Sequence, residues 1–301
     1  MAVETMSTPR SSLPNTYTNV TAREIDFVQT FGRNWKALME ILGIMRPIKK
    51  QNGTRLVSFV SDVTLENGNV PAGAVIPYSK SAIEKKLIKD ITIEKYAKAV
   101  TIEDVEQYGA DVAIEKSDEA FKNKLQSKVM NDFYTFLLDD TYAITETYAN
   151  FQMAVSMAIG LVKNKFQDMD RDVTDVVVFA NTLDAYAYLG SVGITTQTMF
   201  GIEYVKDVLG AKTMILSSKI PTGKVIGVPS DNINLYHADP ADSDYAKLGL
   251  EYRTDGETNL IGFHAQGNYG TAVGESFALM GMALFSEYAD GIAVVTINAN
   301  P

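Results

Sequence analysis

The sequence predicts an α+β fold, and three observations predict it. Apolar residues recur at steps of three and four over two long stretches, 21–43 and 112–139, as on one face of a helix. Two strand-like runs, 54–65 and 84–102, are separated by a loop rich in Gly and Pro. Residues 246–301 are again mostly strand-like, which closes the chain with β structure.

Composition indicates a globular protein that is held together by non-covalent packing. The chain has 301 residues, of which 46% are hydrophobic, and this length is enough for two modest domains. It contains no cysteine, which excludes a disulfide framework, a thiolate metal site and a thiol nucleophile.

Acidic residues outnumber basic ones, 37 to 27, and the net charge is −10. A uniformly acidic protein does not bind phosphate backbones over its whole surface. Residues 33–55 are locally basic, and we interpret them as a solvated face. No signal peptide and no run of about 18 apolar residues is present, so we expect a cytoplasmic product without a membrane span.

The N-terminal half predicts an arm, a helix and a long hairpin. Residues 1–21 are rich in Ser, Thr, Pro and Asn, as in an extended arm, and the first helix then ends near Gly43. The runs 54–65 and 84–102 form a hairpin whose loop tip contains Asn67-Gly68, Pro71, Gly73 and Pro77. Because an isolated two-stranded ribbon is marginally stable in water, this hairpin needs another surface to lie on.

The rest of the chain predicts a long straight helix followed by a compact α/β region. The helix over 112–139 would be a rod of roughly 40 Å. A further helix is expected at 148–164, a buried strand at 176–180, and a helix capped by Asn181 or Thr182. Further strands are expected at 213–217, 224–228, 233–237, 248–254, 259–266, 272–285 and 292–297. No internal repeat or linker is visible, so we expect an interwoven chain.

A search for catalytic, cofactor and metal sites finds none. His237 and His264 have no second His or Cys at ligand spacing, and we interpret both as structural. The acidic run from Asp168 to Asp175 lacks the Gly and the final Glu of a calcium loop. Gly223-Lys224 lacks the preceding Gly and the hydroxyl residue of a phosphate loop, and Ser276 lacks the flanking Gly pattern of a nucleophile elbow.

The order of segments is more informative than any motif. The chain runs through an arm, a helix, a hairpin with a Gly/Pro tip, a long helix, an α/β region and closing strands. This order resembles the Hong Kong 97-fold major capsid proteins of tailed phages, especially those of Gram-positive siphophages. Residues 69–137 resemble the extended loop, peripheral strand and spine helix, and VVVFANTLDAYAYLG at 176–190 resembles part of the axial domain. The resemblance covers about 22–297.

The resemblance implies a shell protein and no enzyme. It divides the chain into an arm (1–21), an N-terminal helix region (22–53), an extended hairpin loop with a peripheral-domain strand (54–102), a peripheral domain with the spine helix (103–147), an axial domain (148–245), and closing strands of both domains (246–301). Because apolar residues on an exposed loop are costly unless another subunit covers them, we expect intersubunit contacts at the hairpin tip. These contact residues are Val70, Pro71, Val75, Ile76 and Pro77.

The resemblance also implies partners and a location. The chain would form pentamers and hexamers in an icosahedral shell around double-stranded DNA, without sequence-specific binding, with a portal protein at one vertex. Because few residues precede the first helix, a separate scaffolding protein is expected. We expect assembly in the host bacterial cytoplasm and residence in the virion capsid. No crosslink is predicted for Lys80, Lys85, Lys86 or Lys89, because no matching Asn or catalytic Glu is identified.

Two alternatives remain open. An encapsulin, a cellular nanocompartment shell of the same fold, differs by holding an enzyme cargo instead of a genome. An α/β enzyme is the alternative from a different class, and the failed site searches argue against it.

Overall fold

The computed structural model describes residues 16–44, 47–139, 143–173, 175–193, 195–199, 202–241, 245, 247–288 and 291–298. The chain forms two compact units. Unit 1 comprises Met1–Arg33, Ile93–Gln126 and Asp239–Gly281, and unit 2 comprises Asn34–Thr92, Ser127–Ala238 and Met282–Pro301. Each unit is therefore assembled from three segments that are far apart in the sequence.

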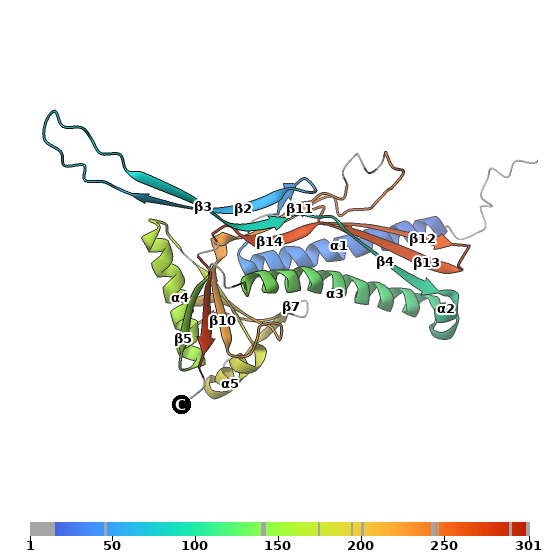
Figure 1. Cartoon of the computed structure of the whole chain (residues 1–301). Coiled ribbons are helices and arrows are strands. Elements are labelled where there is room, and N and C mark those ends of the chain that lie inside the picture. The colour runs from blue at the N-terminus through green and yellow to red at the C-terminus, as the bar shows by residue number, and fades with distance from the viewer. Residues whose placement is uncertain are drawn as a thin grey trace, which may run out of the picture. The chain divides into compact units, whose positions relative to one another are not determined.

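Unit 1 pairs a small antiparallel sheet with two helices. The strand order is β12 (Ile261–Asn268), β13 (Val273–Met280) and β4 (Glu94–Thr101). The first part of α1 (Thr16–Leu42) and that of α3 (Ala110–Leu137) run alongside this sheet (Figure 1). Aromatic rings join the two helices to the sheet. Phe27 on α1 stacks on Phe263 of β12 with ring centroids 4.0 Å apart, and its centroid lies 6.2 Å from that of Phe121 on α3.

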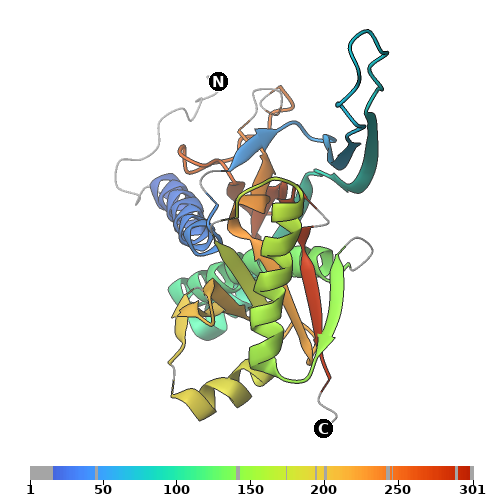
Figure 2. The ribbon, with the colours of Figure 1, turned by 90° about the vertical axis from the view of Figure 1, so that its left-hand side faces the viewer.

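Unit 2 is built around a seven-stranded mixed sheet in the order β5-β15-β10-β6-β9-β8-β7. These strands are β5 (Ile144–Tyr148), β15 (Ala293–Ile297), β10 (Lys224–Pro229), β6 (Val176–Ala180), β9 (Ala211–Leu216), β8 (Ile202–Val208) and β7 (Gln197–Met199). Helix α4 (Phe151–Asp168) lies across one face of the sheet, as Figure 2 shows. It approaches closely at Gly227, where an added Cβ would stand 3.1 Å from the carbonyl oxygen of Ala158.

Unit 2 also contains the second parts of α1 and α3, a further helix, a short helical turn, a second sheet and a hairpin. Helix α5 (Thr182–Val192) is capped by Asn181, whose Oδ1 accepts a hydrogen bond from the Leu183 N–H. A 3₁₀ turn, η1 (Ser230–Asn232), leads into the second sheet, which joins β1 (Ile48–Lys50), β11 (Ile233–Ala238) and β14 (Met282–Ser286). Strands β2 (Arg55–Thr64) and β3 (Lys80–Asp90) pair only with each other among the described residues.

Most of the elements predicted from the sequence are confirmed. The long helix at 112–139 is α3, and four residues of its apolar stripe are buried. The predicted strand at 176–180 and the Asn181 cap are also present. The first helix is longer than expected because α1 begins at Thr16, so residues 16–21, which we had placed in the arm, are helical. Residues 1–15 lie outside the described residues.

Other expectations were wrong. The run 84–102 is not one strand, because it is divided into β3, which belongs to the hairpin, and β4, which belongs to the sheet of unit 1. Residues 248–254 do not form a strand, and only Arg253 makes a bridge, to Phe263. Gly249, with φ of +72°, and the turn at 247–249 interrupt the extended backbone there. Helix α2 (Ile102–Tyr108) and strands β1, β5, β7 and β8 were not predicted.

Candidate functional site

The hairpin of unit 2 presents the residues that we expected to contact a neighbour. Its strands pair in register from Arg55↔Asp90 to Thr64↔Lys80, with a shift at Ser58/Phe59. The base is fixed by an Arg55–Asp90 ion pair of 2.9 Å, and by hydrogen bonds between Ile91 and the turn at Gly53 and Thr54. Ile91 is buried, so the base is anchored in unit 2 while the hairpin extends away from it (Figure 1).

The loop tip at 65–79 exposes large apolar side chains. Relative exposure is 88% for Val75 and 71% for Ile76, and Leu65 and Tyr78 are exposed as well. Pro71 and Pro77 are exposed, and Val70 is half-buried. The structure therefore places all five residues that we predicted as contacts in one exposed loop.

The loop is shaped by local hydrogen bonds instead of a core. The Glu66 N–H donates to Ser79 Oγ (3.2 Å) across the base of the loop, and the Asn69 N–H donates to Asn67 Oδ1 (3.0 Å). The Ala74 N–H donates to the Pro71 carbonyl (3.0 Å) in a turn that requires Gly73 at φ +86°. These bonds are local, and the side chains of Leu65, Val75, Ile76 and Tyr78 remain exposed.

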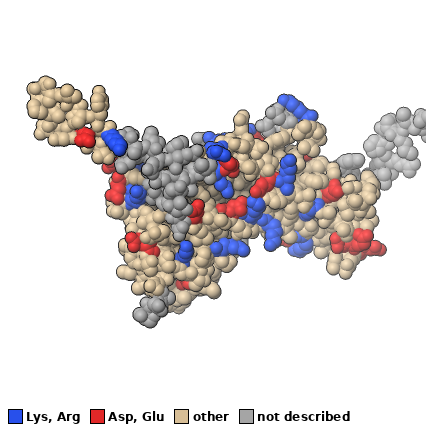
Figure 3. Space-filling model, in the orientation of Figure 1, with Lys and Arg blue, Asp and Glu red and all other residues tan. Residues whose placement is uncertain are grey.

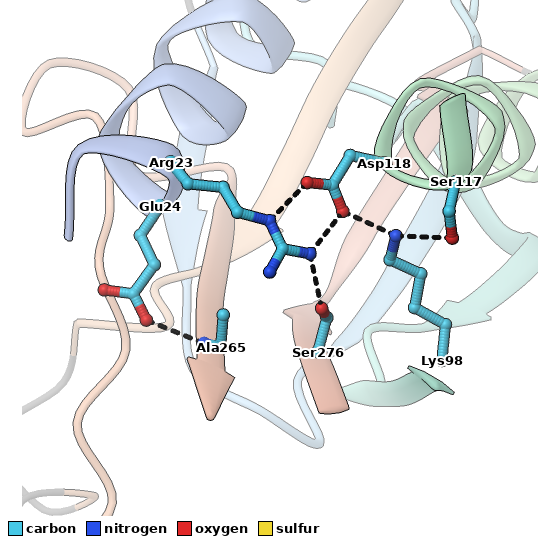
Figure 4. Close-up of polar contacts among 7 residues, drawn as sticks. All are labelled: Arg23, Glu24, Lys98, Ser117, Asp118, Ala265 and Ser276. Atoms are coloured by element: carbon cyan, nitrogen blue, oxygen red, sulfur yellow. Dashed lines mark hydrogen bonds and ion pairs between the residues drawn. The ribbon is translucent and has the colours of Figure 1, made fainter. Parts of the chain in front are cut away.

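A second feature is a charged cluster that joins the layers of unit 1 (Figure 4). Arg23 on α1 donates two hydrogen bonds to Asp118 on α3, from Nε to Oδ2 (2.5 Å) and from Nη2 to Oδ1 (2.7 Å). Nη2 also donates to Ser276 Oγ on β13 (2.9 Å). Lys98 on β4 lies 2.5 Å from Asp118 Oδ1 and donates to Ser117 Oγ (2.7 Å). The Asp118 carboxylate thus connects α3 to α1 and β4, and Arg23 extends the cluster to β13.

Arg23 and Lys98 both contact the Asp118 carboxylate. Burial and these contacts shift the pKa values of Asp118 and Lys98. Burial alone would raise the pKa of Asp118, but the hydrogen bonds from Arg23 and Lys98 hold it below its usual value. Burial lowers the pKa of Lys98 by more than its contacts with Asp118 raise it, and the nearby Arg23 charge adds to the lowering. The Asp118 carboxylate therefore holds Arg23 and Lys98 together at one point in unit 1.

A neighbouring carboxylate, Glu24, ties α1 to β12. Its Oε1 accepts the backbone N–H of Ala265 (2.7 Å) and lies 3.2 Å from His264 Nδ1. Arg253 Nε lies 3.9 Å from the other oxygen, and the Glu24 side chain is only 6% exposed. These contacts give His264 a structural position beside a buried acid.

Several of the other residues that we tested for chemistry are buried or have structural contacts. Ser276 is fully buried and held by Arg23, and His237 is buried on β11. Asp175 pairs with Lys212 at 2.5 Å, and the Gly223 N–H donates to Asp184. Among the described residues, no group of three or more His, Cys, Asp or Glu side chains could hold a metal ion. Nor is any helix in the described ranges long and apolar enough to cross a bilayer.

Sequence reasoning missed the charged cluster. Arg23 and Asp118 are 95 residues apart, and Arg23 and Ser276 are 253 apart, so no local pattern links them. It also missed α2, for which a signal was present. Thr101 and Asp104 form a capping box, the spacing that marks a helix start.

Comparison with known proteins gives matches of structure alone, because no protein-family model and no curated protein matches the chain. The cyanophage A-1(L) capsid asymmetric unit is similar over 86% of this chain and 92% of that chain, with a TM-score of 0.55 and 12% identity. The virus-like particle from Pyrococcus furiosus is similar over 90% of this chain and 97% of that chain, with a TM-score of 0.49 and 12% identity. The holo-SrpI encapsulin complex from Synechococcus elongatus PCC 7942 is similar over 100% of this chain and 94% of that chain, with a TM-score of 0.47 and 10% identity.

The similar structures are mostly phage major capsid proteins, and an encapsulin is among them. At 12% identity the likeness to the cyanophage capsid is one of fold. The chain has the Hong Kong 97-like capsid fold, an α+β architecture, as the resemblance of its sequence implied.

Proposed function

We propose that this chain is the subunit of a closed icosahedral protein shell, and specifically the major capsid protein that encloses the double-stranded DNA of a tailed phage. One observation carries the proposal. A chain with a capsid fold presents an anchored hairpin whose tip exposes Val75, Ile76 and Tyr78 at 88%, 71% and 95%. Soluble monomers rarely expose contiguous large apolar side chains, and such patches mark interaction sites.

The hairpin gives a reason why the assembled shell would be more stable than the separate subunit. Two strands without a third partner are marginally stable in water. Among the described residues, β2 and β3 pair with no other strand. A neighbouring copy that covers the apolar tip removes its area from water, with a gain of roughly 25 cal/mol for each Å² of apolar surface. Val70, Pro71, Val75, Ile76 and Pro77 are the proposed contacts.

The two units support separate roles in such a shell. Unit 1, with α3 and the sheet β12-β13-β4, corresponds in our proposal to the peripheral domain and its spine helix. Unit 2, with the seven-stranded sheet, corresponds to the axial domain and packs around the five-fold and six-fold positions as pentamers and hexamers. A separate scaffolding protein and a portal protein at one vertex complete the proposed assembly in the host cytoplasm.

The chemistry of the chain suits a container. A net charge of −10 disfavours tight binding of the inner wall to packaged DNA, so the genome is enclosed without sequence-specific contacts. The two most buried carboxylates of unit 1 make structural contacts: Asp118 pairs with Arg23 and Lys98, and Glu24 accepts the backbone N–H of Ala265. We therefore propose no reaction and no cofactor for this protein.

The contents of purified particles test the proposal against its nearest alternative. Particles from an infected or induced host should contain double-stranded DNA that survives nuclease outside the shell and is released by denaturation. A protein cargo without DNA would contradict the phage assignment and favour an encapsulin-type compartment. A soluble protein of 33.0 kDa that never assembles, with or without scaffold, would contradict both.

A further inference from the structure

The chain contains two Asn-Gly dipeptides, and both are exposed in unit 2. Asn52-Gly53 lies in the turn at the base of the hairpin, and Asn67-Gly68 lies in its loop tip. In such a pair the backbone nitrogen of Gly can attack the side-chain amide of Asn, because Gly has no Cβ to obstruct the approach. Exposure does not distinguish the two pairs, but their hydrogen bonds do.

The nitrogen of Gly53 is held in a hydrogen bond. The Gly53 N–H donates to the carbonyl of Ile91 (2.8 Å), whose side chain is buried. A second bond, from the Thr54 N–H to the Gln51 carbonyl (3.1 Å), closes the same turn. The Gly53 nitrogen must lose both its proton and this hydrogen bond before it can attack, so the fold protects Asn52.

The nitrogen of Gly68 has no such protection. Its N–H donates to no other residue in the part of the chain that the structure describes. The Asn67 amide is drawn toward the backbone that follows it, because its Oδ1 accepts a hydrogen bond from the Asn69 N–H (3.0 Å). This donor also stabilises the negative charge that develops on Oδ1 when a nitrogen adds to the amide carbon.

We propose that Asn67 deamidates in the folded protein, whereas Asn52 does not. The Gly68 nitrogen loses its proton to solvent base and forms a bond to Cγ of Asn67, and the bond from Cγ to Nδ2 breaks, so that ammonia leaves with a proton from water. Water then adds to either carbonyl of the succinimide ring and breaks its bond to the Gly68 nitrogen, which gives aspartate or isoaspartate. The net reaction consumes water and releases ammonia. It is a modification of this chain and not catalysis.

The modification changes the charge of the loop tip. Glu66 is the only charged residue in 65–79, and Figure 3 shows a largely uncharged surface at this end of the hairpin. A carboxylate at 67 adds a second negative charge three residues before Val70. Fresh and aged subunits therefore present different tips to the contacts that we propose. The deamidation itself does not rest on the proposed function, because it needs only this chain and water.

Peptide mapping of unassembled, folded subunits tests the proposal. The protein is incubated at mildly alkaline pH in water labelled with heavy oxygen, which marks only product formed during the incubation, and is then digested with trypsin. The two sites fall in separate peptides, 51–55 and 56–80. Asn67 should react at least about tenfold faster than Asn52, because a hydrogen bond protects Gly53. Equal rates at the two sites, or an unmodified Asn67, would overturn the proposal.

Two controls separate the effect of the fold from that of the dipeptide. In urea the hydrogen bond of Gly53 is lost, so Asn52 and Asn67 should react at similar rates, and continued protection of Asn52 would exclude the fold as its cause. Gly68→Ala adds a Cβ that meets no atom within 4 Å, so this variant should fold normally. Its Asn67 should react at least about tenfold more slowly, because the Cβ obstructs the attack. Unchanged modification of Asn67 in Gly68→Ala would contradict attack by the backbone nitrogen.

Discussion

The guanidinium of Arg23 and the carboxylate of Asp118 meet in a two-point ion pair, with N–O distances of 2.5 and 2.7 Å across 95 residues of sequence. Two-point pairs of this kind are stronger and more specific in geometry than single hydrogen bonds between neutral groups. The Asp118 carboxylate also forms an ion pair with Lys98, so α1, α3 and β4 are joined at one point. The Asp118 side chain is therefore one of the contacts that fix the two helices against the sheet of unit 1, beside the Phe27–Phe263 stack.

Replacing that side chain should destabilise the protein. Asp118→Asn keeps the shape but leaves Arg23 and Lys98 as mutually repelling cations with side-chain exposures of 23% and 11%. Removing one partner of a largely buried pair costs about 3 kcal/mol. Urea titration of the unassembled protein measures the loss. Glu119→Gln, which removes the exposed pair with Lys116, is the control and should cost at most about 1 kcal/mol.

The same variant should reveal a pH dependence. The pKa of Asp118 lies below its usual value in the folded state, so its stabilisation is present above the unfolded pKa of about 3.9 and is lost as pH falls through the folded pKa. The difference in unfolding free energy between wild type and Asp118→Asn should be constant from about pH 7 to 5 and shrink below about pH 4. A difference that persists unchanged at pH 3 would exclude charge as its origin.

The aromatic stack of unit 1 offers a test of packing. Phe27 and Phe263 are 4% and 0% exposed and their rings are nearly parallel, at 14°. Phe27→Ala should therefore cost about 3 to 5 kcal/mol, because it removes buried apolar area and leaves a cavity. Phe27→Leu fills most of that space and should recover part of the loss. Thermal unfolding of the two variants side by side measures the difference, and equal midpoints would contradict this packing.

Charges at the hairpin tip should block assembly without affecting the subunit. Val75→Asp/Ile76→Asp places carboxylates where an apolar contact is proposed, and particles should be lost in sedimentation. Because both side chains are exposed, the unfolding free energy should change by no more than about 0.5 kcal/mol. Val75→Ile/Ile76→Leu keeps the surface apolar and should assemble. Normal particles from the Asp variant would show that the tip is not a contact.

Much of the fold could be predicted because its strongest signals are local. The stripe from Leu125 to Leu137 marks α3 by helical periodicity, and its members at 125, 129, 133 and 137 are buried. The hairpin was predicted from a Gly/Pro loop between two runs of strand-like residues, since turn chemistry depends on neighbours in sequence. Asn181 caps α5 for the same reason.

The remaining features depend on tertiary context. Strand β5, ITETY, carries polar residues at its centre and is stabilised by parallel pairing with β15, about 150 residues later, which no periodicity reveals. The run 84–102 was wrongly joined because β3 and β4 are separated only by residues 91–93, although they belong to different sheets. The charged cluster lies beyond sequence reasoning because Arg23, Lys98, Asp118 and Ser276 come from four separate segments.

Electron microscopy of the purified protein, expressed with and without candidate scaffold, tests the central claim most directly. The account predicts closed shells with icosahedral symmetry in which the hairpin of each subunit lies on a neighbouring copy. Density showing the hairpin folded back on its own subunit within such shells would contradict the proposed contact. A homogeneous population of 33.0 kDa monomers under every assembly condition would contradict the account as a whole.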